Sequence, residues 1–224
     1  MKKIFLLLMA VCLCVCSYAQ KKNIKNIKNI KSHTCLTLYT SFLNNMSKID
    51  EYYASYYPDY NKTEIPMIGM KVGLTLPIIT KKLYFSGNCS FANGFSIDKK
   101  GYIKSQYKNL SSFRITATVE YPVYENGKIG RFALNSGVLF DQSYFVYNRK
   151  DPLSSISLSC FNIYVPININ WSFFSFAEIE GFSFFIQYNI IVSKGTASIR
   201  GLKVFNKDLY FGHNNFEIGA TYLF

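Results

Sequence analysis

The stretch FRITATVEYPVYENGKIGRFALNSGVLF, residues 113–140, contains two runs in which apolar residues alternate with polar or small ones. In the first run the apolar positions are Phe113, Ile115, Ala117, Val119 and Tyr121. A period of two is the pattern of a β-strand with one apolar face. The sequence ENG at 125–127 lies between the runs and predicts a tight turn. The stretch therefore predicts an antiparallel hairpin.

The same alternation recurs along the rest of the chain. It marks eight segments of nine or ten residues, near 35–43, 68–76, 83–92, 113–121, 132–141, 161–170, 182–191 and 216–224. Nine to eleven residues is the length with which a tilted strand crosses a bilayer. Long connections alternate with short ones, as in outer-membrane barrels, and the long ones are 44–67, 93–112, 142–160 and 192–215. We predict an all-β fold, an eight-stranded antiparallel up-and-down transmembrane β-barrel over 35–224.

Prolines and aromatic residues gather near the predicted short turns. Three prolines are expected near these turns, where a missing N–H donor costs least: Pro77, Pro122 and Pro166. Five aromatic residues are expected to form a belt at the turn side of the membrane: Tyr84, Tyr121, Tyr124, Trp171 and Tyr222.

The polar phase of the eight segments indicates which barrel face meets water. The apolar phase carries no charge, and the polar phase carries only five charges: Lys71, Arg114, Glu120, Asp141 and Glu217. A water-facing surface normally has about 25 to 35% charged residues. Small uncharged polar residues suit a narrow barrel interior instead. We expect the apolar face to meet lipid and Lys71, Arg114, Glu120 and Glu217 to point inward. There they would form an ion-paired filling or, as the alternative, a selectivity constriction.

The beginning of the chain has a different composition. Two lysines precede an apolar run, IFLLLMAVCLCVC (4–16), and SYA follows it. Thirteen residues at a helical rise of ~1.5 Å span about 20 Å, too little for a bilayer. We predict a signal peptide over 1–19, cleaved after Ala19. Residues 20–34 contain KKNIKNIKNIK and are predicted to be a basic low-complexity periplasmic tail.

Catalytic and metal chemistry have little support in the sequence. Three cysteines follow the predicted signal at wide spacings, so we predict neither a disulfide framework nor a metal site: Cys35, Cys89 and Cys160. His213 shares a predicted outer loop with Ser193, Ser198 and Asp208, which leaves a hydrolase site as an alternative, although no motif fixes its geometry. We predict a protein that is not an enzyme and has no cofactor.

The predicted outer loops carry residues suited to recognition. The first contains five tyrosines, Tyr52, Tyr53, Tyr56, Tyr57 and Tyr60. They suit either a stacking platform for sugars or peptides or a loop that packs on itself. Later loops are basic, with Lys99, Lys100, Lys104, Lys108, Lys194, Arg200, Lys203 and Lys207. A net charge of +12 would by itself suggest nucleic acid as a partner. Because lipopolysaccharide phosphates lie at the height of these loops, we expect their basic residues to contact lipid head groups instead.

Four stretches together resemble the bacterial outer-membrane β-barrel family described as porin-like or PorT-type: GMKVGLTLP (69–77), residues 113–140, FNIYVPININW (161–171) and FEIGATYLF (216–224). The resemblance implies insertion in the outer membrane of a Gram-negative cell and no single activity, since such barrels range from structural proteins to parts of secretion systems. Phe224, with Tyr222 two positions before it, resembles the signal that the barrel-assembly machinery recognises. The Lys-Asn-Ile tract departs from the family's pattern.

The sequence thus predicts an integral outer-membrane barrel with a structural or recognition role through its long external loops. The alternatives are a small outer-membrane barrel enzyme acting on lipid or peptide, and a soluble secreted barrel that carries a small ligand. Expected partners are outer-membrane lipids including lipopolysaccharide, the barrel-assembly machinery and proteins of the envelope or of a secretion system.

Overall fold

The structure is a computed structural model that describes residues 33–42, 51, 55, 66–78, 83–97, 107–126, 130–148, 156–173, 182–199, 202–203, 212 and 214–223. Four predicted features lie outside these residues: the signal peptide with most of the basic tail, the tyrosines of the first loop, most basic residues of the later loops (Lys99, Lys100, Lys104, Arg200 and Lys207), and Phe224. Among the described residues, no helix is long and apolar enough to cross a membrane.

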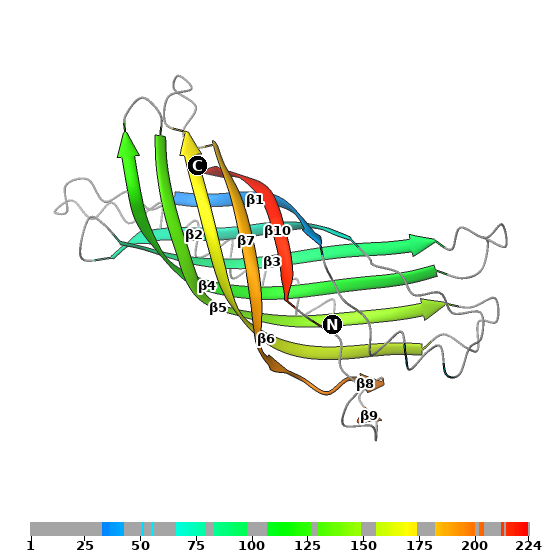
Figure 1. The fold of residues 1–224 in the computed structure, drawn as a ribbon. Coiled ribbons are helices and arrows are strands. Elements are labelled where there is room, and N and C mark those ends of the chain that lie inside the picture. Colours follow the sequence, from blue (N-terminus) through cyan, green and yellow to red (C-terminus); the bar gives the residue numbers. More distant parts are fainter. Residues whose placement is uncertain are drawn as a thin grey trace.

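Ten strands of the described residues form one antiparallel sheet. Eight are long: β1 (His33–Phe42), β2 (Met67–Pro77), β3 (Tyr84–Ile97), β4 (Tyr107–Asn126), β5 (Gly130–Asn148), β6 (Ile156–Phe173), β7 (Phe182–Lys194) and β10 (Asn215–Leu223). The other two, β8 (Ser198–Ile199) and β9 (Leu202–Lys203), pair with each other, and β8 also pairs with β6. Each long strand pairs with the next, and β10 pairs with both β7 and β1, so the wall closes on itself (Figure 1). The predicted eight-stranded antiparallel barrel is confirmed.

Apolar side chains cover the outside of this wall. Ile68 is 72% exposed, Leu38 57% and Ile186 52%. The residues that alternate with them point inward and are buried, and most are small or polar, such as Ser86, Thr116 and Asn189. A barrel that is soluble in water has the opposite arrangement, because its apolar side chains fill the centre.

The strands on one side of the barrel are longer than the eight predicted segments. β4, β5 and β6 contain 20, 19 and 18 residues, whereas β1, β2 and β10 contain 10, 11 and 9. The long strands continue past the ends of their shorter neighbours, and β3 to β6 project together at one end of the barrel (Figure 1). The sequence prediction ended these strands early because the apolar alternation stops before the hydrogen-bonded pairing does.

Two predicted turn features are corrected by the strand pairing. Pro166 lies within β6, where the β5–β6 pairing is interrupted between Ser136↔Ile167 and Leu139↔Tyr164, so the missing N–H falls at an irregular position. In the predicted ENG turn, Glu125 and Asn126 still pair with β5, so the strands are joined by residues 127–129. Pro77 does end β2, as expected.

Candidate functional site

A buried cluster of four charged residues lies inside the barrel, and we call Lys71, Arg114, Asp141 and Glu217 the central ion cluster. Lys71 Nζ is 2.7 Å from Glu217 Oε2, and Arg114 Nη1 donates to the other carboxylate oxygen. Arg114 Nε is 3.4 Å from Asp141 Oδ2. The four side chains come from β2, β4, β5 and β10. Arg114 and Asp141 are register partners on neighbouring strands, whereas the Arg114–Glu217 pair joins strands on different sides of the wall. Two cations face two carboxylates, and the cluster is neutral.

Neutral groups satisfy the carboxylates of the central ion cluster further. Asn189 Nδ2 donates to Glu217 Oε1 at 2.9 Å, and Gln187 Nε2 lies 3.4 Å from Glu217 Oε2. Ser112 and Ser143 both donate to Asp141 Oδ1, at 2.6 and 3.0 Å. A buried charge is costly unless it is paired and hydrogen-bonded, so these contacts make the cluster a filling rather than a set of open binding groups.

Aromatic rings complete the surroundings of Lys71. Its Nζ lies 4.5 Å from the ring centroid of Tyr39 and 4.6 Å from that of Phe185. Both rings are buried inside the barrel, where desolvation strengthens a cation–π contact. Lys71 is thus held by one carboxylate and two rings, which leaves it little freedom to bind a solute.

A second ion pair lies nearer the short-turn end of the barrel. Arg131 Nη2 donates to Glu120 Oε1, and Asn135 Nδ2 donates to Glu120 Oε2 at 3.2 Å. The guanidinium carbon of Arg131 lies 4.1 Å from the ring centroid of Tyr84. Tyr84 therefore belongs to the interior and not to the predicted lipid-facing belt. Arg131 was missed because the predicted segment began at residue 132. The hairpin register pairs Arg131 with Glu125, and its long side chain reaches along the inner face to Glu120.

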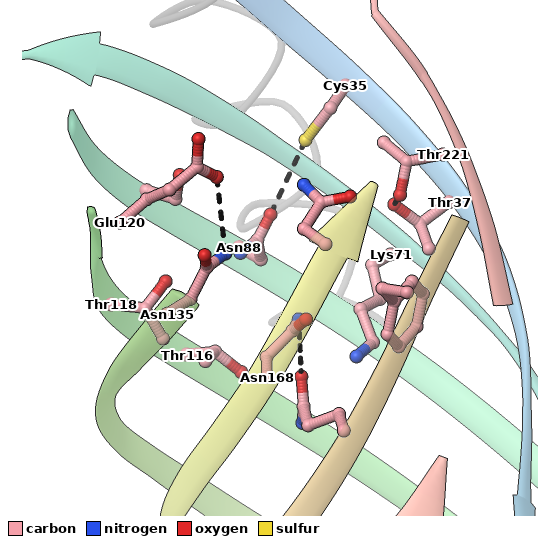
Figure 2. A pocket seen from close by; sticks show the side chains of 14 residues that line it. Cys35, Thr37, Lys71, Asn88, Thr116, Thr118, Glu120, Asn135, Asn168 and Thr221 are labelled. Carbon is pink, nitrogen blue, oxygen red and sulfur yellow. Dashed lines mark hydrogen bonds between the residues drawn. The ribbon is translucent and has the colours of Figure 1, made fainter. Parts of the chain in front are cut away.

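A small polar cavity lies between Lys71 of the central ion cluster and Glu120 of the second ion pair. Its volume is about 70 Å³, and Figure 2 shows amide and hydroxyl side chains around it. The carboxylates fix which way two of its amides point. Asn135 donates its N–H to Glu120, and Asn168 donates to Gln187, which itself donates toward Glu217. The oxygens of both amides have no hydrogen-bond partner among the described residues, so the cavity wall is rich in acceptors.

The cavity suits a few water molecules. A water needs roughly 10 to 15 Å³ of such volume, whereas pockets for drug-sized ligands occupy about 300 to 1,000 Å³. Its described lining is Cys35, Thr37, Lys71, Ser86, Asn88, Thr116, Thr118, Glu120, Asn135, Asn168, Asn170, Phe185, Gln187 and Thr221. Its size and polarity do not fit the apolar ligand that a secreted carrier barrel would hold.

Aromatic side chains form a belt on the outside at each end of the apolar surface. At the short-turn end, the Trp171 ring stacks on Phe132 with centroids 5.2 Å apart, and the Tyr222 ring lies 5.7 Å from that of Phe182. At the other end lie four phenylalanines that we call the outer phenylalanine belt: Phe91, Phe113, Phe140 and Phe161. Phe140 and Phe161 stack with centroids 6.3 Å apart. Two belts around an apolar band are typical of barrels that span a membrane.

The remaining candidate residues are not brought into a described site. None of the three described cysteines, Cys35, Cys89 and Cys160, forms a disulfide. The described residues contain no group of three or more His, Cys, Asp or Glu side chains that could hold a metal ion. Ser193 is exposed near the outer end of β7, while His213 and Asp208 of the imagined hydrolase site lie outside the described residues.

Comparison with known proteins yields structural likeness only. No family model matches the chain, so the PorT-type assignment gains no support, and no curated protein matches it either. Among solved structures, Neisserial surface protein A matches with a TM-score of 0.47 and 10% identity, over 88% of this chain and 98% of that one. Ail, the attachment invasion locus protein of Yersinia pestis, matches with a TM-score of 0.45 and 11% identity, over 86% and 97%. The barrel assignment rests on the strand pairing described above.

Proposed function

We propose that this protein is an integral outer-membrane β-barrel, exported by a signal peptide that is removed after Ala19, and that it has a structural or recognition role without catalysis. The observation that carries the proposal is the reversal of the faces: apolar side chains outside, paired ions and amides inside. Water-soluble monomers rarely expose a contiguous apolar patch larger than about 300 to 600 Å². In a membrane the outward apolar side chains of every long strand contact hydrocarbon, so their exposure to water is avoided.

The interior supports a non-catalytic role. A catalytic acid, base or nucleophile must reach a substrate, whereas each charged residue of the central ion cluster is buried and already bound to another. The cavity beside the cluster is too small for a lipid or peptide substrate. Any recognition is therefore assigned to the outside of the barrel and its outer loops.

The outer loops supply the recognition chemistry. Their lysines and arginines are suited to the phosphates of lipopolysaccharide, and the five tyrosines of the first loop offer a stacking surface for sugar or peptide. Reversing the charge of Lys99, Lys100 and Lys104 is expected to weaken association with lipopolysaccharide. Unchanged association would remove this part of the proposal.

The membrane assignment is tested by a pair of arginine substitutions at exposed positions. Leu38→Arg places a charge in the apolar band, where an arginine near the bilayer midplane costs about 2 to 4 kcal/mol. Asn93→Arg is the matched control, because Asn93 is exposed beyond the outer phenylalanine belt. Outer-membrane fractionation and heat-modifiable gel mobility should show loss of the folded form for Leu38→Arg and its retention for Asn93→Arg. Equal tolerance of both, with the wild type in the soluble fraction, would refute the proposal.

A further inference from the structure

The two faces of the wall exchange character beyond the outer phenylalanine belt. On β4, the outward positions change from Phe113 to Ser111 and Asn109, while Leu110 between them points inward and is buried. On β6, Ser159 lies outward beyond Phe161, while Leu158 is completely buried on the inner face. The apolar-out pattern of the barrel is thus inverted in the projecting part of the wall.

β5 shows the same exchange. Outward Phe140 is followed by Gln142 and Tyr144, and inward Phe145 is completely buried. On three neighbouring strands the first outward residues beyond the belt are therefore polar, and on β5 the outward position after Tyr144 is again apolar, Val146. The change marks the level at which the outer surface of the protein stops being suited to hydrocarbon.

The outward polar residues are aligned across the sheet. Strand register places Asn93, Ser111, Tyr144, Ser159 and Ser198 beside one another, and we call these five residues the polar outer row. Ser111 Oγ lies 3.0 Å from Asn93 Oδ1, and the hydroxyl oxygens of Ser159 and Ser198 are 2.7 Å apart. The row contains hydroxyl and amide groups and no charge.

The height of the row places it among lipid head groups. Residues 107–112 of β4 extend beyond Phe113, and six residues at ~3.3 Å each along a strand tilted by about 45° rise roughly 14 Å. The polar region of a leaflet is about 5 to 8 Å thick before any attached saccharide, as total and hydrocarbon thicknesses of about 40 to 45 Å and 30 Å imply. Ser111 begins this rise, so it stands where the head groups of neighbouring lipids begin, and the row runs obliquely past it because the strands are tilted.

We propose that the polar outer row binds neutral sugar residues of the outer-leaflet glycolipid whose acyl chains contact the outer phenylalanine belt. We identify the ligand from the continuity of the two surfaces along the same strands. A lipid chain lying against Phe113 and Phe161 has its own head group beside Ser111 and Ser159. The inference rests on the proposed membrane location and adds a surface and a ligand class to it.

The chemistry of the row favours sugars over phosphates. A hydroxyl donates once and accepts twice, and an amide does both, which matches the hydroxyls of a saccharide. Phosphate oxygens are best bound by arginine or lysine, and none of the five row residues is either. The register continues from Ser198 at the end of the row to Lys203, where the basic residues of the outer loops begin. The row and the basic loops would therefore contact different parts of the same lipid.

The test uses the full mature chain folded in detergent and two fluorescently labelled probes: lipopolysaccharide with its complete core oligosaccharide, and lipid A alone. The test variant combines Ser111→Ala, Tyr144→Phe and Ser159→Ala, which remove three hydroxyls and preserve shape. The matched control is Ser136→Ala, a lipid-facing hydroxyl within the apolar band of β5. Each hydroxyl is expected to contribute a factor of at least about two, so the triple variant should bind lipopolysaccharide about tenfold more weakly.

The expected pattern is a loss confined to the saccharide-bearing probe. The triple variant should bind lipid A within about twofold of wild type, and Ser136→Ala should bind both probes as wild type does. The inference is overturned if the triple variant binds lipopolysaccharide as wild type does, or if its affinity for lipid A falls equally. Heat-modifiable mobility of the same samples reports on the membrane proposal separately, so a folded barrel without sugar preference would sink this inference alone.

Discussion

Replacing Glu217 by glutamine should destabilise the barrel strongly, because one carboxylate neutralises two cations in the interior. Glu217 is 0% exposed and binds Lys71, Arg114, Asn189 and Gln187. Glutamine is nearly isosteric with glutamate, so the substitution removes the charge with little change in volume. Arg114 would retain Asp141, whereas Lys71 would lose its carboxylate and keep an amide oxygen and its two aromatic neighbours.

The magnitude follows from the cost of an uncompensated buried charge. Removing one partner of a buried ion pair typically costs about 3 to 5 kcal/mol. Because Lys71 lines the polar cavity, where water can solvate its ammonium group, we expect the lower end of that range, about 3 kcal/mol. Glu120→Gln is the matched control, and it should cost less, about 1 to 2 kcal/mol, because the Glu120–Arg131 pair is less deeply buried.

The assay is urea unfolding of the chain folded into phospholipid vesicles. Fluorescence of Trp171, the single tryptophan, and loss of heat-modifiable mobility report unfolding. Adding Lys71→Met to Glu217→Gln should recover part of the loss, because the unpaired ammonium group is removed and Arg114 keeps Asp141. A free energy of unfolding for Glu217→Gln within about 0.5 kcal/mol of wild type would refute the central ion cluster as a stabilising filling.

Three further predictions address packing, assembly and permeation. Gly137→Ala should lower the urea concentration at which the barrel unfolds, because an added Cβ would meet the backbone of Ala117 and Thr118. Gly87→Ala should be neutral, because its Cβ would meet the Phe85 ring at 3.7 Å. Equal effects of the two substitutions would contradict this packing. Deleting Phe224 should reduce the folded form in cell envelopes without impairing refolding into vesicles in vitro, and a normal level in cells would remove the assembly-signal prediction. The wild-type barrel should show negligible conductance in planar bilayers because paired side chains fill its interior; large stable channels would contradict this.

The sequence was most informative where one physical rule acts on every residue of a strand. Strand alternation depends only on the face that each residue occupies, so the directions of Ile68, Lys71 and Glu217 could be read without knowing their neighbours. Which inward charges meet depends on register and barrel closure, which no local pattern specifies. Glu217 of the last strand thus meets Lys71 and Arg114 from strands far earlier in the chain.

Other features are visible in the sequence but are missed when strands are recognised by their alternation alone. The projecting ends of β4 to β6 invert the pattern, so residues such as Ser111 and Phe145 resemble an interruption of the strand. Tyr84 is aromatic and close to a turn, which suits a membrane belt equally well. Its inward position follows from pairing with Glu120, a non-local contact.

The most direct measurement compares two adjacent residues of β7 in a lipid bilayer. Ile186 is 52% exposed on the outer surface, while Gln187 is 3% exposed inside. A spin label at Ile186 should collide more often with oxygen, which concentrates in hydrocarbon, than with a water-soluble nickel complex, and the label at Gln187 should be nearly inaccessible to both. If the label at Ile186 instead collides mainly with the nickel complex, the apolar face meets water and the membrane-spanning account is wrong.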